Sequence, residues 1–516
     1  MNRLVEFRPV LGAYILETLT LGMYGETKIA IREYVQNAFD SLQEAVSRGL
    51  LPQEKAHVEL KLHADHQGIT IRDNGMGIRT ESAVQVLAAV GASNKSFAKN
   101  AGFRGIGRLA GIVFCDSLIF TTKAAGQTER TVVAINAKKL REKLAPDSEN
   151  EDDAAKTLAA CVEAHIEPDE EKAAHYFEVR MEGYHEPPKE AKDIIALKIF
   201  LQQVSPLPFS PKFSFAKQIN DKGREVGLPI ESIHVFVKDG DEPAEEIFKP
   251  YTDQVQVKAK TVPIALEFVQ SPTQKWWGWV GRKKVPGIVK DVFKGIRVRM
   301  KNIQIDDVDI MREIFAYPIK ESAKARSSYL RFAEWYIGEV HVAPAAAVPN
   351  ARRDGFEEND EWKALREELE DEVYRLGKEA YRTSKGDQIS IENIQRLFAN
   401  LKASVDVLQP GNWDRLSQLA AEAVGVQNRI AQASAIAEEE EKEALRTLHA
   451  NNLALKARIQ ELTIDEPPAH DCEEEIAKAR SKLTQTIYTE LRDRLGPTEW
   501  KKAMHAIQNV TGEPPH

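Results

Sequence analysis

A helix that carries three polar residues on one side, followed by a strand that ends in an acidic glycine turn, most restricts how this chain can fold. The segment from Ile29 to Val46 carries apolar residues at helical spacing. Glu33, Asn37 and Asp40 stand at positions i, i+4 and i+7, so they share one helix face. On a helix that packs against a sheet, such groups need water, a ligand or a metal as partners. Taken alone, the pattern also fits the polar stripe of a half-exposed helix.

The turn that follows has the sequence Asp-Asn-Gly-Met-Gly-Ile and spans residues 73–78. Apolar and polar residues alternate in 57–63 and again in 68–73, which predicts two short strands, the second running directly into the turn. A carboxylate held at a strand end, such as that of Asp73, can accept a hydrogen bond from an exocyclic amine. Gly75 and Gly77 allow backbone and base to approach closely, although acidic glycine turns are common in loops of every kind.

A third element is the glycine-rich run at 102–111, which precedes an apolar helical stretch. Gly102, Gly105 and Gly107 offer backbone N–H groups and a helix N-terminus to a phosphate. The run is not a dinucleotide-binding fingerprint, because no strand leads directly into it. It is not a P-loop either, because no Gly-Lys-Ser/Thr follows.

Taken together, the three elements resemble the nucleotide-binding domain of the GHKL family, the Bergerat fold. This fold is shared by gyrase-type topoisomerases, heat shock protein 90, sensor histidine kinases, MutL and MORC proteins. Residues 31–42 resemble the family's N-box, 73–78 its first glycine box and 102–111 its second. The resemblance covers about a quarter of the chain and implies a domain that binds and hydrolyses ATP.

The resemblance implies a role for each matched residue. Glu33 would be the general base that activates water, Asn37 would coordinate Mg²⁺, and Asp40 would support this network. Asp73 would bind the adenine amine, and Gly75 and Gly77 would shape the adenine pocket. Gly102, Gly105 and Gly107 would surround the phosphates. Lys95, in the lid that the resemblance implies, would contact a phosphate, and a solvated loop lysine is an equally good interpretation of it. The Gly-Thr that the family often has at a late strand is missing from the corresponding segment 175–183.

The expected fold class is an α/β (α+β sandwich) N-terminal domain of Bergerat type, an α/β middle domain and an all-α C-terminal region. We place the ATP-binding domain at 1–210, the middle domain at 211–356 and the helical region, with a coiled coil near 439–462, at 357–516. The middle domain is predicted from strand patterns at 233–238, 261–269, 276–281, 295–305 and 336–343. The acidic stretch 145–175 is expected to be a solvated insertion or helix.

The segment Val-Pro-Asn-Ala-Arg-Arg-Asp at 348–354 resembles the middle-domain loop of heat shock protein 90 chaperones. The resemblance aligns Arg353, with Arg352 as its neighbour, with an arginine that reaches the γ-phosphate. An arginine from a second domain would act as an arginine finger and couple hydrolysis to domain closure. The alternative is a surface arginine pair that holds Asp354 or Glu357.

Three functions fit these features. The first is an ATP-driven, chaperone-like conformational machine resembling heat shock protein 90, expected to be a homodimer, with no particular client indicated. The second is a DNA-directed ATPase of the MORC or MutL kind, in genome maintenance or phage defence, suggested by the basic strip 278–301; a solvated strand face is the other interpretation of that strip. The third is a nucleotide-dependent scaffold that hardly hydrolyses ATP.

The bulk composition restricts partners and compartment. A formal net charge of −9 argues against general binding of polyanions, so nucleic acid is possible but not favoured. Three widely separated cysteines fit neither a disulfide framework nor a zinc site. No apolar stretch reaches the length of about 18 residues that a membrane span needs. We therefore expect a soluble cytoplasmic protein without a membrane partner.

Overall fold

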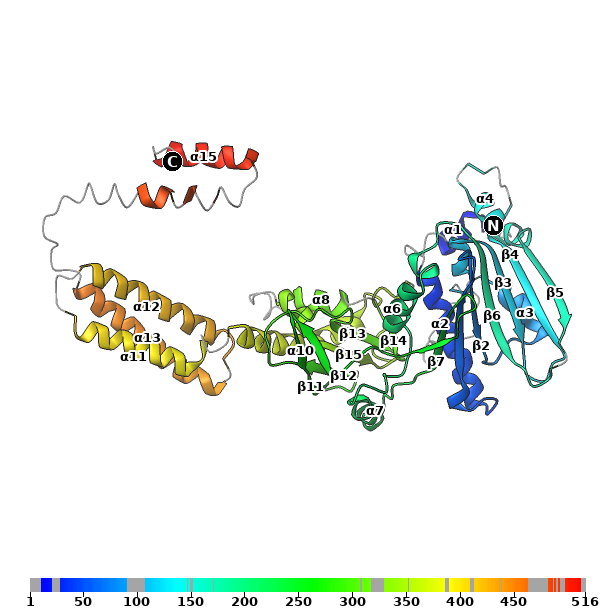
Figure 1. Ribbon diagram of the computed structural model, residues 1–516, viewed down its shortest axis with the longest axis horizontal. Helices are drawn as coiled ribbons and strands as arrows, with labels where there is room; N and C mark the ends of the chain where they lie inside the picture. The colour runs from blue at the N-terminus through cyan, green and yellow to red at the C-terminus, as the bar shows by residue number, and fades with distance from the viewer. Residues whose placement is uncertain are drawn as a thin grey trace, which may run out of the picture. The chain divides into compact units, whose positions relative to one another are not determined.

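The structure is a computed structural model that describes residues 11–20, 28–90, 107–145, 147–148, 152–169, 171–306, 309–316, 329–350, 352–385, 389–408, 413–437, 439–462, 481–485, 487–488, 491 and 497–511. The chain divides into two compact units, Met1–Ser384 and Lys385–His516 (Figure 1).

The first sheet of the larger unit has eight strands in the order β5-β4-β3-β6-β2-β1-β7-β8. Neighbouring strands are antiparallel, except that β1 and β7 are parallel. Because β6 pairs with both β2 and β3, the end of β2 lies near the end of β3 and the start of β6. The strands are β1 His57–Leu62, β2 Gly68–Asp73, β3 Cys115–Lys123, β4 Glu129–Asn136, β5 Val162–Pro168, β6 Tyr176–Tyr184, β7 His234–Asp239 and β8 Glu245–Ile247.

Helices pack against this sheet. Along β1, Val58, Leu60 and Leu62 are buried while the residues between them are partly exposed, which is the pattern of a strand with one face on a core. Helix α2 lies against β1 and β2, and α3 against β3 and β4. The helices of this part are α1 Tyr14–Thr20, α2 Ile29–Ser47, α3 Thr80–Ala88, α4 Ala137–Leu144, α5 Ala154–Ala159 and α6 Ile194–Val204, with 3₁₀ turns η1 Gln53–Lys55, η2 Gly107–Val113 and η3 Lys189–Ala191.

A second, five-stranded sheet in the same unit has the order β11-β12-β15-β13-β14, with β13 parallel to β15. Its central strands are buried on both faces, and helix α10 contributes Trp362, Leu365, Leu369 and other apolar residues to its core. The elements are α7 Ala216–Glu225, β9 Gln254–Val257, β10 Lys260–Pro263, β11 Ala265–Gln270, β12 Trp276–Arg282, β13 Gly295–Met300, β14 Ile303–Gln304, α8 Asp309–Ala316, η4 Leu330–Trp335, β15 Ile337–Val342 and α10 Asp360–Lys385.

The smaller unit is helical where it is described. Leu445, Leu448, Leu455 and Ile459 of α13 are buried, and this helix packs on α11 and α12. A buried hydrogen bond from the Asn452 amide to the Ala423 carbonyl, 3.1 Å long, joins α13 to α12. The helices are α11 Ile391–Asp406, α12 Trp413–Ser434, α13 Glu439–Leu462 and α15 Pro497–Thr511.

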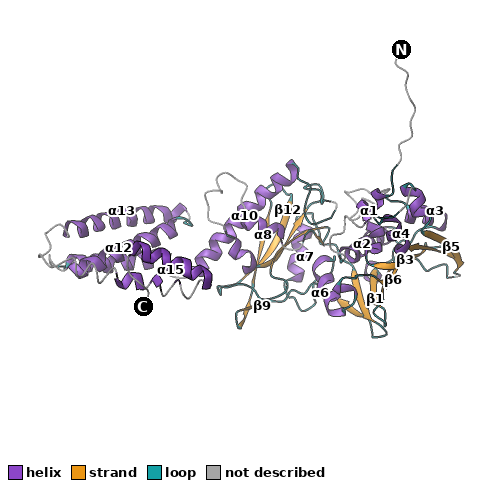
Figure 2. Ribbon diagram, turned by 90° about the horizontal axis from the view of Figure 1, so that it is seen from above, coloured by secondary structure: helices purple, strands orange, loops and turns teal. Residues whose placement is uncertain are grey.

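The expected fold class is confirmed: a mixed α/β N-terminal region, a further sheet and a helical C-terminal region follow one another (Figure 2). Three details differ from the expectation. The strand at 233–238, expected in the second domain, pairs with β1 in the first sheet. The stretch 145–175, expected to be an insertion or helix, contains the edge strand β5 as well as α5. The apolar stripe of α10, expected in the C-terminal region, packs on the second sheet.

Candidate functional site

The polar face of α2 is the centre of the candidate site. Glu33 and Asn37 are partly buried, and Asp40 is 6% exposed. One edge of this face continues through Ser41, one turn beyond Asn37, and the other edge is formed by Arg32. The three polar residues predicted from the sequence thus lie between two flanking groups, each of which contacts a different part of the unit.

Ser41 connects α2 to the turn at 73–78. Its hydroxyl donates to Asp73 Oδ1 at 3.2 Å and accepts from the Met76 amide at 2.9 Å. Asp73 is the last residue of β2 and is 3% exposed, and its Oδ1 also accepts from the Gly75 amide at 2.9 Å. The predicted carboxylate at a strand end is therefore fixed beside α2.

Both predicted glycines of this turn occupy positions where no side chain fits. A Cβ on Gly75 would lie 2.2 Å from Ser41 Oγ. Gly77 has φ of +60°, and a Cβ there would lie 1.9 Å from the Lys123 carbonyl oxygen. The turn is thus pressed against both α2 and the end of β3.

Gly107 lies directly against the Glu33 carboxylate. A Cβ on Gly107 would be 2.4 Å from Glu33 Oε2. The 3₁₀ turn η2, which begins at this glycine, is tied to α2 by Tyr34, whose hydroxyl donates to the Arg108 carbonyl at 3.0 Å and accepts from the Gly111 amide at 2.9 Å. The end of the second glycine box therefore meets the N-box helix. Lys95, Gly102 and Gly105 lie outside the described residues.

The loop that contains Arg353 reaches the opposite edge of α2. The Arg32 side chain donates to the carbonyl of Arg352 at 2.8 Å. Arg353 is 7% exposed and has φ of +55°, whereas the side chain of Arg352 faces solvent. Positive φ is uncommon for a residue with a side chain, and the Asp306 amide stabilises this conformation by donating to the Arg353 carbonyl at 2.8 Å.

Lys301, in the turn between β13 and β14, lies near this edge as well. Burial lowers its pKa, while the charges of Asp40 and Glu231 raise it and that of Arg353 lowers it. Asp40 and Arg353 are therefore both within electrostatic range of one lysine. The polar face of α2 thus has the turn at 73–78 at one edge and basic side chains of the second-sheet region at the other.

A buried ionic cluster joins the second sheet to the connector after α6. Glu339 of β15 accepts from Lys249 Nζ at 2.7 Å and also pairs with Arg299. Arg299 donates in addition to the Gln203 carbonyl at 2.8 Å. His341 Nε2 lies 3.3 Å from Glu339, and all four side chains are 6% exposed or less. Burial lowers the pKa of Lys249 to about 7 and that of His341 to about 4, whereas the two cations hold the pKa of Glu339 well below its ordinary value against the effect of burial.

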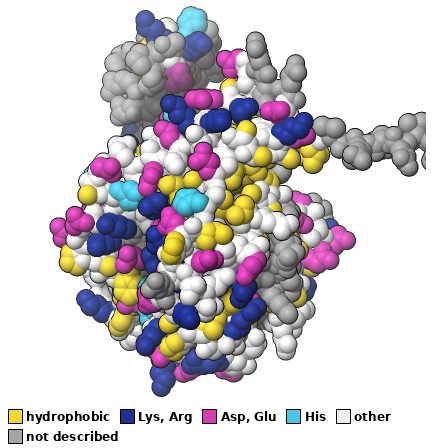
Figure 3. Space-filling model, turned by 90° about the vertical axis from the view of Figure 1, so that its right-hand side faces the viewer, with side chains coloured by type: hydrophobic (Ala, Val, Ile, Leu, Met, Phe, Trp, Pro, Cys, Tyr) yellow, Lys and Arg dark blue, Asp and Glu magenta, His cyan; other side chains and the backbone are white. Residues whose placement is uncertain are grey.

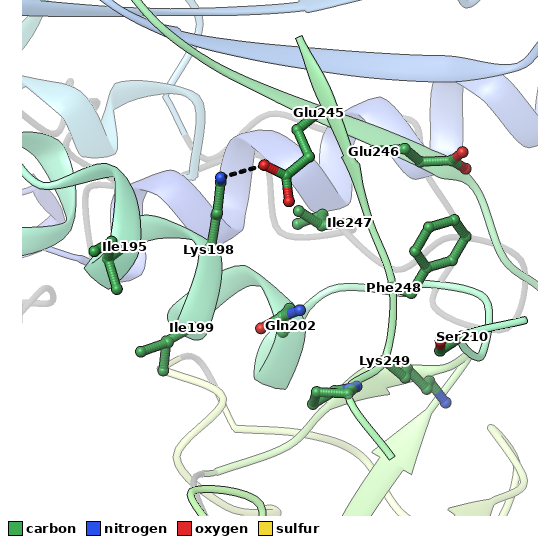
Figure 4. A pocket seen from close by; sticks show the side chains of 11 residues that line it. Ile195, Lys198, Ile199, Gln202, Ser210, Glu245, Glu246, Ile247, Phe248 and Lys249 are labelled. Atoms are coloured by element: carbon green, nitrogen blue, oxygen red, sulfur yellow. Dashed lines mark hydrogen bonds and ion pairs between the residues drawn. The ribbon is translucent and has the colours of Figure 1, made fainter. Parts of the chain in front are cut away.

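A cavity of about 360 Å³ lies between α6 and the segment from β8 to Pro250 (Figure 4). Its charged groups have partners, since Lys198 pairs with Glu245 at 2.6 Å and Glu246 pairs with His234. It contains none of the residues predicted from the sequence. We assign no ligand to it.

Most cations of the basic strip 278–301 are engaged or buried within the protein. Lys284 and Lys290 are its exposed lysines. Arg282 pairs with Glu267 and Glu379, Lys294 with Glu334 and Arg299 with Glu339, while Lys283 donates to the Gly287 carbonyl, Arg297 is buried and Lys301 is partly buried. On the face at the first-sheet end of the larger unit, which Figure 3 shows, acidic and basic side chains are likewise interspersed among the described residues. The strip therefore supports DNA binding less than its sequence alone suggested.

The described residues also limit the kind of metal site. Among them, no group of three or more His, Cys, Asp or Glu side chains is arranged to hold a metal ion. Asn37 offers one hard oxygen ligand, which fits Mg²⁺, an ion that keeps several waters and is bound largely through substrate phosphates. Within the part of the chain that the structure describes, no helix has the length and apolar character needed to cross a membrane.

Sequence reasoning missed Ser41, Arg32 and His175 as parts of the site. His175 Nδ1 lies 2.5 Å from the Gly75 carbonyl oxygen, immediately before β6. Ser41 could have been found from its place eight residues after Glu33 on the same helix side. No local signal points to Arg32 or His175, because their partners are 320 and 100 residues away in the chain.

Comparison with known proteins agrees with this geometry. Residues 25–161 match the model of the histidine kinase-, DNA gyrase B- and HSP90-like ATPases. The chain is 27% identical to the chaperone protein HtpG of Streptomyces coelicolor over 137 residues, which is 23% of this chain and 22% of that protein. It is 26% identical to the HtpG of Rickettsia typhi over 155 residues, 27% of this chain and 25% of that protein.

These matches span about a quarter or less of the length of those relatives. The family match covers α2, the turn at 73–78 and Gly107, the elements that meet around Glu33. The resemblance stated from the sequence is thereby confirmed for this part of the chain: residues 25–161 form its domain of the histidine kinase-, DNA gyrase B- and HSP90-like ATPase type.

Proposed function

We propose that this chain binds ATP on the polar face of α2 and hydrolyses it, and that hydrolysis is coupled to contact between the nucleotide-binding region and the loop at 350–356. The observation that carries the proposal is the arrangement around α2. Ser41 holds the Asp73 turn on one edge, Arg32 holds the Arg352 carbonyl on the other, and Glu33 lies between them.

The base would bind at the Asp73 end. A buried carboxylate that accepts hydrogen bonds from Ser41 and Gly75 is held in one orientation, so it can discriminate a base with an exocyclic amine. Asn37, one turn before Ser41, would supply an amide oxygen to Mg²⁺, which would bridge the phosphates and offset their charge. Gly75 and Gly77 would allow the base to approach the backbone.

Glu33 would accept the proton of the attacking water. Gly107 leaves room for this carboxylate, and Asp40 would support the network from the same face. Arg353 would supply positive charge for the phosphates from the second-sheet region, as arginine fingers do in other ATPases. Its burial beside α2, in contrast to the exposed Arg352, supports this choice between the two arginines.

The similarity to HtpG supports a chaperone-like conformational machine, with ATP-dependent closure in a homodimer. The lid residues Lys95, Gly102 and Gly105 would close over the phosphates. DNA-directed activity has less support, because most cations of the basic strip are buried or bonded within the protein.

The test is a comparison of Glu33→Gln with Asp73→Asn in the full chain. We expect Glu33→Gln to bind ATP normally and to lose at least about a hundredfold in turnover, the usual contribution of a general base. We expect Asp73→Asn to lose ATP binding. The matched control is Glu44→Gln, an exposed position on the same helix that pairs with Arg48, which should change neither property.

Failure can be assigned to separate parts of the proposal. If the unmodified protein binds no ATP, the whole proposal is wrong. If Glu33→Gln turns ATP over at the normal rate, the catalytic role of Glu33 is wrong while ATP binding stands. The chaperone-like part is tested by whether ATP changes the ability of the protein to keep a heat-denatured enzyme soluble, and by whether Glu33→Gln abolishes that change.

A further inference from the structure

The turn at 73–78 is held by side chains from β2, α2 and β3 and from the segment just before β6. The Gly75 amide donates to Asp73 of β2, and the Met76 amide donates to Ser41 of α2. The Ile78 amide donates to Thr122 Oγ1 of β3 at 2.8 Å. The fourth contact is between His175 and the Gly75 carbonyl, at 2.5 Å. The position of the Asp73 carboxylate is therefore fixed by residues well outside the turn.

The contact of His175 is defined chemically. A carbonyl oxygen can only accept, so Nδ1 of His175 carries the hydrogen and donates it to Gly75. The neutral δ-tautomer and the imidazolium both provide this donor. The Gly75 carbonyl lies between the Gly75 amide, which is bonded to Asp73, and the Met76 amide, which is bonded to Ser41. By holding this carbonyl, His175 also constrains the backbone between Asp73 and Gly77.

Residues shortly before His175 are bonded to a buried lysine at the end of β3. Lys123 Nζ is completely buried and donates to Asp169 Oδ1 at 2.7 Å and to the Glu171 carbonyl at 2.5 Å. The Ala174 amide donates back to that Glu171 carbonyl at 3.0 Å. Asp169 and the turn from Glu171 to Ala174, which directly precedes His175, are thus anchored to the same strand end against which Gly77 is pressed.

Thr122 closes this arrangement. Its hydroxyl accepts from Ile78 and donates to the Tyr176 carbonyl at 3.2 Å, so one side chain connects the turn to the start of β6. His175 and Thr122 therefore hold the middle and the end of the glycine turn, His175 from the segment just before β6 and Thr122 from β3. We call these two residues, together with Lys123, the strand clamp.

We propose that His175 is a positioning residue for nucleotide selection, which holds the Asp73 carboxylate where it distinguishes a base with an exocyclic amine from one without. This inference rests on the proposed function, since it concerns the same site. His175 would not touch the nucleotide to do this. It would act through the Gly75 carbonyl, with Thr122 as the second contact of the strand clamp.

The experiment measures the dissociation constants of ATP and of inosine triphosphate, which lacks the exocyclic amine, for the full chain. We expect the unmodified protein to prefer ATP. His175→Ala should weaken ATP about three- to tenfold, in line with the loss of one hydrogen bond, and should leave inosine triphosphate nearly unchanged. His175→Asn should restore the preference, because its amide can place a donor near the position of Nδ1.

A second pair of variants provides a test that does not depend on how His175→Ala folds. Thr122→Val removes the acceptor for Ile78 and should reduce the ATP preference in the same way, whereas Thr122→Ser should keep it. His165→Asn, on the edge strand β5, is the control, because its exposed imidazole contacts Glu167 and not the turn. Thermal unfolding of each variant without nucleotide reports whether the fold is retained.

The outcomes separate this inference from the proposed function. If the unmodified protein prefers ATP and folded His175→Ala keeps that preference, the positioning role is wrong and the ATP site stands. If His175→Ala weakens both nucleotides equally and His175→Asn does not rescue, the residue supports the pocket as a whole and selection by His175 is again wrong. If the unmodified protein binds neither nucleotide, the proposed function falls and this inference falls with it.

Discussion

The side chain of Arg32 donates a hydrogen bond to the main-chain carbonyl of Arg352, with 2.8 Å between Nη2 and the oxygen. Arg32 immediately precedes Glu33 in α2, and Arg352 immediately precedes Arg353 in the loop. One contact therefore joins the helix that carries the proposed general base to the loop that carries the proposed arginine finger. The donor is buried, so water competes little for the bond.

This contact predicts that Arg32→Met slows ATP turnover without weakening ATP binding. Loss of the bond frees the loop, so Arg353 is less often in place when the phosphate is transferred. We expect kcat to fall about tenfold, equivalent to about 1.4 kcal/mol, while the dissociation constant of ATP stays within about twofold.

The control is Arg48→Met at the end of the same helix, where the arginine is exposed and pairs with Glu44. It should leave kcat unchanged, because exposed ion pairs contribute little. An unchanged kcat in Arg32→Met would show that the position of the loop at 350–356 does not affect ATP hydrolysis. A loss of ATP affinity equal to the loss of kcat would instead place Arg32 in the binding pocket.

The close approach of Gly107 to Glu33 leads to a second prediction. A methyl group at position 107 would lie 2.4 Å from Glu33 Oε2, so Gly107→Ala must displace either the carboxylate or η2. A displaced base cannot reach its water, and we expect kcat to fall at least about tenfold. Binding of ATP should change by less than about threefold, because the three atoms nearest to the added methyl all belong to Glu33.

Steady-state kinetics together with equilibrium ATP binding decide this prediction. Gly425→Ala in α12 is the matched control, because the added methyl meets only Arg429, at the ordinary distance of 3.6 Å. Alanine is favoured over glycine inside a helix, so this variant should be at least as stable and equally active. Equal turnover of Gly107→Ala and the unmodified protein would show that Glu33 is not confined as the structure indicates.

The sequence predicted best the features that depend on near neighbours. The helical spacing of 29–46 predicts α2 because buried residues repeat with the period of a helix. The glycines of 73–78 permit a tight turn, and Gly77 adopts a positive φ of +60° there. In both cases the residues that determine the structure lie within a few positions of one another.

The features that sequence reasoning missed depend on distant partners. Strand 233–238 has an alternating pattern that fits any half-buried strand, and only packing places it beside β1 in the first sheet. Strand β5 is largely exposed at the sheet edge; Val162, Ala164 and Ile166 do alternate with polar residues along it, but the acidic, Ala-rich sequence around it fits a solvated helix equally well. His175 and Arg32 bind main-chain carbonyls, and any residue type provides a carbonyl.

The buried cluster around Glu339 predicts how the stability of the larger unit depends on pH. His341 stacks on Trp277 with 4.9 Å between ring centres and lies 3.3 Å from Glu339. Burial lowers its pKa from 6.5 to about 4, because a charged imidazole would lose its water and face Lys249 and Arg299, an effect that Glu339 only partly offsets. Above pH 6.5, His341 is neutral in both the folded and the unfolded chain.

Between about pH 6.5 and 4 the unfolded chain binds a proton at this position and the folded chain does not. The free energy of unfolding therefore falls as the pH falls, by about 1.4 kcal/mol per pH unit for this one proton. Below about pH 4 both states are protonated, and this contribution stops changing.

His341→Phe, which keeps a ring beside Trp277, should remove this one-proton contribution to the slope of the unfolding free energy against pH. The slope is measured by denaturant unfolding of the full chain at several pH values. His165→Asn should leave the dependence unchanged, because the His165 side chain is 57% exposed. Parallel pH profiles for His341→Phe and the unmodified protein would mean that His341 takes up its proton equally well in the folded state, and that the cluster does not exclude a further positive charge.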